Sequence, residues 1–287
     1  MATLSVLGST MYYEEQGAGR PVVFLHGNPT SSHVWRKVMA EMPAAGRLLA
    51  PDLIGMGQSG KPSIRYDFDD HARYLDAWFD AAGLSDVVLV GHDWGGSLAL
   101  DWAARHPGRV AGVAFMETVV RPMTWADFPG PARERFEALR TPGTGEAIVL
   151  GSNDFLEKSL AATILHPLAA EDLNVYRAPY QTRESRLPLL QWPRAFPIDG
   201  LPKTVVERVD AYDSWLAASL DVPKLLLTFD GPPGTLLIGE EAIGWCETYI
   251  AGLSVAGCGP ARHNAPEDQP AAIAAAVIDW MRQNDLH

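Results

Sequence analysis

Residues 87–104, which read VVLVGHDWGGSLALDWAA, decide the fold. The apolar run at 87–90 predicts a buried strand, and residues 97–104 predict a helix. The turn between them, residues 91–95, has the form Gly-x-nucleophile-x-Gly, which exposes a nucleophilic side chain at a sharp strand-to-helix bend. Asp93 occupies the nucleophile position. Because a carboxylate attacks carbon and leaves an ester on the enzyme, this turn favours substrates with an electrophilic sp³ carbon, such as alkyl halides or epoxides.

Length and composition indicate a large core in one elaborated domain or in one domain plus an insertion, since the chain has 287 residues. The formal net charge of −12 argues against nucleic acid or an anionic membrane as a partner. The two cysteines, Cys246 and Cys258, suggest neither a disulfide framework nor a zinc site. We therefore expect an enzyme that uses no metal and no cofactor.

The N-terminal residues show no basic segment followed by a long apolar core. No apolar run along the chain approaches the roughly 18 to 20 residues that a membrane span needs. These features predict a cytoplasmic protein without membrane association. We expect a monomer or a small homo-oligomer.

Strand and helix signals alternate over most of the chain, a pattern typical of a mainly parallel sheet with helices on both faces. An opening hairpin is expected at 3–15. The remaining strands are expected at 22–25, 47–51, 87–91, 110–116, 224–228 and 252–256. Helices are expected at about 69–82, 204–219, 240–250 and 269–283.

The alternation stops between about residues 120 and 204, where prolines and aromatic residues gather and the apolar spacing has a period of 3.6. This pattern favours a helical cap inserted into the sheet domain. We expect a core domain of residues 1–119 and 205–287 and a cap domain of residues 120–204.

An ester on Asp93 must be hydrolysed by water, and water needs a base, for which histidine has the most suitable pKa. His263 follows the last expected strand, where the chain order nucleophile, acid, histidine places the base. His26 is expected to shape its loop, and His92 to lie buried beside the nucleophile. His33, His71, His106 and His166 are expected to be surface residues or helix-capping residues, and His287 is the last residue.

Two carboxylates compete for the role of orienting His263. Glu117 ends the strand at 110–116, and Asp230 follows the strand at 224–228. Both lie at the carboxyl edge of the sheet, where ligands collect in open α/β folds. The residue pattern leaves the choice open.

Asn28 and Trp94 are expected to place N–H donors above Asp93. Their backbone N–H groups suit an oxyanion hole, since one follows the nucleophile and the other lies in the loop after the strand at 22–25. The Trp94 indole and the Asn28 amide could also hold a departing anion.

Three segments that carry these residues resemble the haloalkane dehalogenases: Leu25 to Ser32, Asp52 to Ser59 and Gly91 to Gly96. The resemblance extends over nearly the whole chain, and its most specific part is the pairing of Asn28 and Trp94 with an aspartate nucleophile. It implies an α/β-hydrolase fold with a mostly parallel eight-stranded sheet flanked by helices and an inserted helical cap. Arg262 and the segment 264–266 depart from the family pattern beside the base.

The resemblance implies hydrolysis of small halogenated hydrocarbons by water, which yields an alcohol, a halide ion and a proton. The family branch that it matches uses the earlier acid, Glu117. Apolar cap and loop residues are expected to wall a closed pocket. They are Phe128, Pro129, Phe136, Phe155, Trp192, Pro193 and Leu236.

Three other functions fit parts of the pattern. Epoxide hydrolases share the aspartate turn and the cap, but they place an aromatic residue where this chain has Asn28. Coelenterazine-type luciferases share both the asparagine and the tryptophan. A non-catalytic ligand-binding protein of the same fold could retain all three triad residues.

Overall fold

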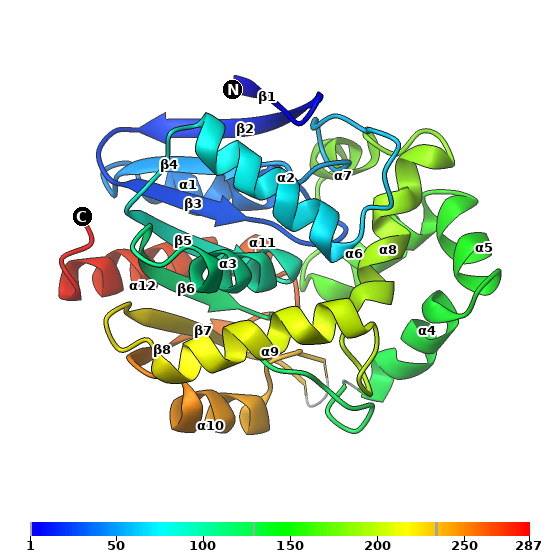
Figure 1. The fold of residues 1–287 in the computed structure, drawn as a ribbon. Helices are drawn as coiled ribbons and strands as arrows, with labels where there is room; N and C mark the ends of the chain where they lie inside the picture. Colours follow the sequence, from blue (N-terminus) through cyan, green and yellow to red (C-terminus); the bar gives the residue numbers. More distant parts are fainter. Residues whose placement is uncertain (1, 129, 233–234) are drawn as a thin grey trace.

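The computed structural model describes residues 2–128, 130–232 and 235–287. Its centre is an eight-stranded sheet in the order β1-β2-β4-β3-β5-β6-β7-β8 (Figure 1). The pairs β1–β2 and β2–β4 are antiparallel, and all later neighbours are parallel. The mostly parallel sheet predicted from the sequence is confirmed. Its strands are β1 (Ala2–Val6), β2 (Ser9–Gly17), β3 (Pro21–Leu25), β4 (Arg47–Pro51), β5 (Val87–His92), β6 (Val110–Met116), β7 (Lys224–Asp230) and β8 (Leu253–Pro260).

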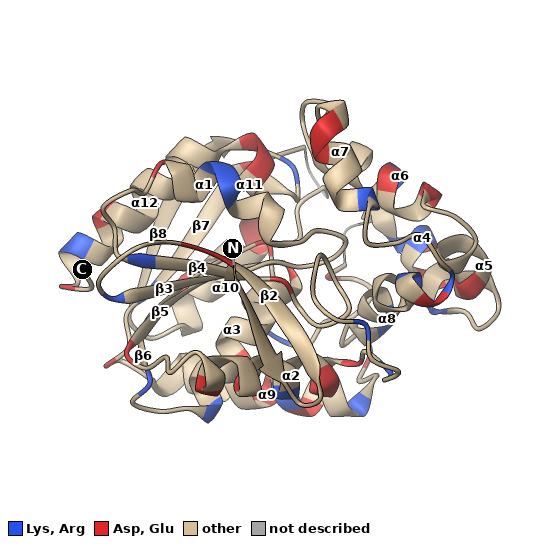
Figure 2. Cartoon of the chain, turned by 90° about the horizontal axis from the view of Figure 1, so that it is seen from above, with Lys and Arg blue, Asp and Glu red and all other residues tan. Residues whose placement is uncertain are grey.

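Helices cover both faces of the sheet, as Figures 1 and 2 show. One face carries α2 (Phe68–Ala81), α3 (Trp94–Arg105) and α9 (Lys203–Ala218), and the other carries α1 (Arg36–Ala40), α11 (Ala265–Asp268) and α12 (Pro270–Gln283). The helix α10 (Glu240–Tyr249) packs beside β8. Because central parallel strands are buried on both faces, they are continuously apolar, and every residue of β5 is buried.

The last strand is longer than the sequence predicts, since β8 ends at Pro260 rather than at residue 256. Gly257 and Gly259 lie in its second half, and glycine weakens the sequence signal for a strand. β8 is an edge strand with mostly exposed or half-buried residues, where such positions are tolerated.

The chain between β6 and α9 is helical, as expected. It contains α4 (Gly130–Arg140), α5 (Thr144–Leu150), α6 (Asp154–Thr163), α7 (Ala170–Arg177) and α8 (Leu187–Ala195). These helices gather beyond the carboxyl ends of the parallel strands (Figure 1), where the loops that carry the site residues emerge. The division into domains at residues 120 and 204 stays a prediction.

Charged residues lie mainly on the helices and loops, while the strands of the central sheet are mostly uncharged (Figure 2).

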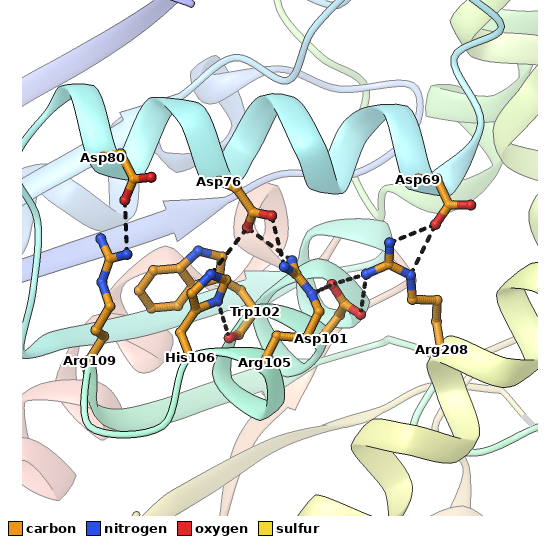
Figure 3. Close-up of polar contacts among 9 residues, drawn as sticks. All are labelled: Asp69, Asp76, Asp80, Asp101, Trp102, Arg105, His106, Arg109 and Arg208. Atoms are coloured by element: carbon orange, nitrogen blue, oxygen red, sulfur yellow. Dashed lines mark hydrogen bonds and ion pairs between the residues drawn. The ribbon is translucent and has the colours of Figure 1, made fainter.

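A chain of ion pairs joins α2, α3 and α9 (Figure 3). At its centre the buried Asp101 carboxylate accepts hydrogen bonds from Arg105 at 2.8 Å and from Arg208 at 3.2 Å. Arg208 also binds Asp69 on α2 at 2.7 Å, and Arg105 binds Asp76 at 2.7 Å. This network fixes the positions of the three helices relative to one another.

A buried carboxylate on α11 joins α7 to α1. Glu267 on α11 is 1% exposed at its side chain and pairs with Arg36 at 2.5 Å and Lys37 at 3.0 Å. The hydroxyl of Tyr176, on α7, donates to the same carboxylate at 2.7 Å. Burial alone would raise the pKa of Glu267, but the Arg36 and Tyr176 contacts lower it overall. The carboxylate is therefore charged and links three elements.

We expect Glu267→Gln to lower the free energy of unfolding by about 3 kcal/mol, because removing the buried carboxylate leaves Lys37 without its ion pair and Arg36 with Asp172 alone. This is the lower end of the usual range, since Arg36 and Lys37 are partly exposed. Urea denaturation measures the change. Asp279→Asn is the control, because its pair with Arg282 at 3.6 Å is exposed and its loss should leave the midpoint unchanged. Equal midpoints for both variants would contradict the role of Glu267.

Among the described residues, no helix combines the length and hydrophobicity that crossing a bilayer requires.

Candidate active site

The turn after β5 places Asp93 between the strand and α3. Its backbone has φ 53° and ψ −130°, a conformation that non-glycine residues rarely adopt. The neighbouring glycines make this turn possible because other backbone atoms lie where a side chain would begin. A Cβ added to Gly95 would lie 2.1 Å from the Leu25 carbonyl oxygen, and one added to Gly91 would lie 2.5 Å from the Cα of Gly96. The elbow geometry predicted from the sequence is thus present.

The Asp93 carboxylate is buried, and its two oxygens have different surroundings. Oδ1 accepts the backbone N–H of Asn28 at 2.7 Å, while Oδ2 lies 3.3 Å from His263 Nε2. Burial alone would raise the pKa of Asp93, but hydrogen bonding and charge from His263, together with His92 and the Trp94 backbone N–H, lower it overall. Asp93 is therefore ionised near neutral pH.

His263 lies between two carboxylates. Its Nδ1 is 3.0 Å from Glu117 Oε2, and its Nε2 faces Asp93. Burial alone would lower the pKa of His263, but the hydrogen bonds and charges of Asp93 and Glu117 outweigh that effect and raise it to about 10. The imidazole is therefore protonated at neutral pH in the resting site. His92 supports this loop, as expected, because its Nε2–H donates to the His263 carbonyl oxygen at 2.7 Å.

The structure distinguishes between the two candidate acids by position. The Glu117 side chain is 1% exposed, and its carboxylate accepts the backbone N–H groups of Leu237 at 2.8 Å and Ile238 at 3.0 Å besides its contact with His263. Asp230 is exposed, and no described residue makes a side-chain hydrogen bond or ion pair with it. The described geometry brings Glu117 to His263 and leaves Asp230 at the surface.

Asn28 and Trp94 provide two side-chain donors next to Asp93. The Asn28 amide nitrogen makes one long hydrogen bond, 3.4 Å to the Leu189 carbonyl oxygen, so its second N–H stays free. The Trp94 ring stacks on Trp192 with centroids 4.9 Å apart, and its indole N–H donates to no described residue. Both residues line a cavity of about 290 Å³ that also reaches Asp93 and His263. Such free donors suit an anion.

The cavity wall matches the predicted pocket only in part. Phe128, Phe136, Phe155 and Pro193 line it, as expected. Trp192 does not, because it packs behind Trp94, stacks on His71 with centroids 4.1 Å apart and donates to the Met56 sulfur at 3.2 Å. Predicting Trp192 at the wall was therefore wrong.

Leu236 was also misplaced by the prediction. It lines a separate cavity near Gly239, and its neighbours Thr235 and Leu237 line the site instead. Consecutive side chains of this loop point in different directions, which the sequence does not reveal. Pro129 lies outside the described residues.

His71 is a further correction, because it is buried rather than at the surface. It stacks under Trp192, and burial lowers its pKa to about 3, so the ring is neutral. His26 shapes its loop as predicted, since its Nε2 accepts the backbone N–H of Leu53 at 2.9 Å.

Several polar residues of the cavity wall were not predicted. The sequence contains a signal for them, because on each of the helices α4 and α6 the lining residues recur every three or four positions and so share a face. On α4 they are Ala132, Arg135, Phe136 and Leu139, and on α6 they are Phe155, Ser159, Ala162 and Thr163. Asn264 and Thr235 complete the polar part. Among the described residues, no group of three or more His, Cys, Asp or Glu side chains is arranged to hold a metal ion.

A mainly parallel sheet with a strand–turn–helix elbow defines an α/β-hydrolase, and residues 20–195 match the family model described as "alpha/beta hydrolase fold". A haloalkane dehalogenase of Mesorhizobium japonicum is 48% identical over 282 residues, which cover 97% of this chain and 90% of the relative. One of Agrobacterium fabrum is 43% identical over 96% of this chain and 89% of its own.

Solved structures agree with the sequence relatives. The haloalkane dehalogenase DbeA of Bradyrhizobium elkani superposes with a TM-score of 0.94 at 44% identity, over 99% of this chain and 98% of its own. DatA of Agrobacterium tumefaciens gives a TM-score of 0.92 at 41% identity, over 99% and 96%. The chain belongs to the haloalkane dehalogenases, hydrolases that act on carbon–halide bonds. The predicted fold and enzyme class are confirmed.

Proposed function

We propose that Asp93 is the nucleophile, His263 the base and Glu117 the acid that orients His263. The observation that supports this assignment is the continuous contact from Asp93 to His263 at 3.3 Å and from His263 to Glu117 at 3.0 Å, at the wall of a cavity that Asn28 and Trp94 share. Small halogenated hydrocarbons are the substrates that a mainly apolar cavity of about 290 Å³ favours.

In the first step Asp93 Oδ2 attacks the halogen-bearing carbon. Oδ2 is the attacking atom because Oδ1 already accepts the Asn28 backbone N–H and so becomes the carbonyl oxygen of the ester. The carbon–oxygen bond forms as the carbon–halogen bond breaks, and the bonding electrons leave with the halide. The Asn28 amide and the Trp94 indole donate to the departing ion.

Alkylation also prepares the base for the second step. His263 is protonated in the resting site because Asp93 and Glu117 raise its pKa to about 10. Once Asp93 is an ester, its negative charge and its attraction for the imidazolium disappear, so the pKa of His263 falls and its proton passes to solvent. The neutral ring then accepts a proton from water, and His263 becomes a base only when an ester is present to hydrolyse.

Water attacks Cγ of Asp93, and the negative charge that develops on Oδ1 is stabilised by the backbone N–H groups of Asn28 and Trp94. The alkoxide leaves with the proton that His263 took from water, and the carboxylic acid formed on Asp93 passes the second proton of the water to His263. Each cycle thus converts haloalkane and water into alcohol, halide and one proton, and restores the carboxylate.

A single turnover in H₂¹⁸O tests this pathway. The alcohol oxygen comes from Asp93 in the ester pathway, so with enzyme in excess over 1-bromobutane the first alcohol formed should contain ¹⁶O and the Asp93 peptide should gain ¹⁸O. Direct attack of water on the substrate would label the alcohol instead and would overturn the proposal. Styrene oxide and coelenterazine, assayed in parallel, test the other functions that the sequence left open.

The leaving-group site gives a separate prediction. Trp94→Phe removes the indole donor, and Asn28→Ala removes the amide but keeps its backbone N–H. Loss of one charge-assisted hydrogen bond, worth roughly 1.5–3 kcal/mol, should slow alkylation by about one to two orders of magnitude. Ester hydrolysis, which breaks no carbon–halogen bond, is the internal control and should change much less.

Rapid-quench kinetics separate the two steps. Alkylation of both variants at the parental rate would mean that these side chains only pack.

The monomeric or small homo-oligomeric state and the cytoplasmic location stay predictions.

A further inference from the structure

The wall of the active-site cavity has a polar segment that the hydrolysis of a simple haloalkane does not use. It is formed by Arg135 on α4, by Ser159 and Thr163 on α6, and by Asn264 after the base. The aromatic residues Phe128, Phe136, Phe155 and Phe196 make up much of the remaining wall. An apolar substrate that filled this cavity would lie against a guanidinium and gain nothing from it.

Arg135 is the one lining residue with a permanent positive charge, and it forms no ion pair with any described residue. Its Nη2 donates to Ser159 Oγ at 2.5 Å and to the Phe155 carbonyl oxygen at 3.4 Å, and the guanidinium lies 5.2 Å from the centroid of the Phe155 ring. The guanidinium is anchored through Nη2, and its Nε and Nη1 donors have no partner among the described residues.

The surroundings of Arg135 differ from those of its helix neighbours. Arg133 pairs with Glu137 at 2.9 Å on the exposed side of α4, and Arg140 donates to backbone carbonyls, among them Phe196 O at 2.8 Å. Burial lowers the pKa of Arg135, and no nearby carboxylate opposes this effect. A guanidinium remains charged in proteins even so, and an uncompensated, partly buried cation gains from a bound anion.

The orientation of the Asn264 amide indicates which polar residue of the wall can bind an anion. Its side-chain nitrogen donates to Thr163 Oγ1 at 2.6 Å, which fixes the amide orientation and leaves Oδ1 buried without a partner among the described residues. An amide oxygen repels an anion and attracts a donor. A carboxylate in this cavity would therefore bind Arg135, whose partner Ser159 lies one helical turn from Thr163 on α6, rather than Asn264.

Resting on the proposed function, we propose that this enzyme prefers haloalkanes that carry a carboxylate at the end opposite the halogen, with Arg135 as the residue that binds the carboxylate. Among the described residues that line the cavity, Asp93 alone is acidic. Like-charge repulsion by Asp93 then disfavours short halo-acids and favours chains long enough to keep the two carboxylates apart. The reaction at the halogen end is unchanged.

The test compares 6-bromohexanoate with 1-bromohexane and with the neutral 6-bromohexanamide. We expect the acid to have the highest kcat/KM, mainly through a lower KM, and its advantage to shrink as ionic strength rises. Bromoacetate should be a poor substrate. Arg135→Gln should lower the ratio of kcat/KM for the acid to that for 1-bromohexane by about 10- to 100-fold, the loss expected for one charge-assisted hydrogen bond.

Arg133→Gln, on the same helix but outside the cavity, is the matched control and should leave that ratio unchanged. If Arg135→Gln does not fold, Arg135→Lys and the salt dependence of the wild-type enzyme answer the same question.

Each result has a distinct meaning. Release of bromide from 1-bromohexane without any preference for the acid overturns the inference and leaves the proposed function standing. Preference for the amide over the acid also overturns it, and points to Asn264 Oδ1 as the recognition group. Absence of bromide release from all three substrates overturns the proposed function itself.

Discussion

His263→Ala is expected to release about one halide per active site and then stop. Alkylation needs the Asp93 carboxylate and the two leaving-group donors, none of which this substitution removes, whereas ester hydrolysis loses its base. Loss of general base catalysis costs about two to four orders of magnitude, so the ester should accumulate. Mass spectrometry of the Asp93 peptide should find the alkyl adduct, and steady-state turnover should fall by that factor.

The pH of the experiment matters because His263 also stabilises the ionised nucleophile. It makes the largest contribution among the contacts that lower the pKa of Asp93, while burial acts in the opposite direction. Without the imidazolium the pKa of Asp93 rises. The halide burst should therefore be fast at alkaline pH and slow as pH falls, beginning at a higher pH than in the wild type.

Asp93→Asn is the matched control for the burst, since it removes the nucleophile and should give neither halide nor adduct. A folded His263→Ala variant that binds substrate and leaves Asp93 unmodified at alkaline pH would contradict the division of roles. Rapid hydrolysis of the adduct in that variant would do so too, because another base would then have to act.

Residues that depend on local geometry could be predicted from the sequence. The turn at Asp93 needs only the strand, the glycines and the helix around it. Asn28 and Trp94 follow β3 and β5, which are neighbours in the sheet, so a parallel order alone brings them together. His263 emerges at the same edge after β8.

Side-chain direction could not be predicted in the same way. Glu117 follows β6 and Asp230 is the last residue of β7, and because these strands are neighbours in the sheet, strand order does not distinguish the two residues. Backbone conformation does, because Glu117 has φ 47° and turns toward His263. Trp192 and Leu236 were placed wrongly for a related reason, since packing against Trp94 and the course of a loop set their directions.

Glu117→Gln is expected to lower kcat by about three to four orders of magnitude, as loss of the carboxylate does in related triads. The substitution keeps the shape but removes the charge that stabilises the imidazolium formed during hydrolysis. It also places an amide where Leu237 and Ile238 donate two N–H groups, so one amide end meets a donor instead of an acceptor. Asp230→Asn, at an exposed position, should change kcat less than twofold.

Two measurements separate this role from a merely structural one. Glu117 is one of the groups that raise the pKa of His263, so Glu117→Gln should lower that pKa, and the acid limb of the hydrolysis step should move to lower pH. In addition, if Glu117 acts through His263, adding Glu117→Gln to His263→Ala should slow hydrolysis little further, because the two losses are not additive. Full additivity of the two losses, or a larger loss in Asp230→Asn than in Glu117→Gln, would move the orienting acid away from Glu117.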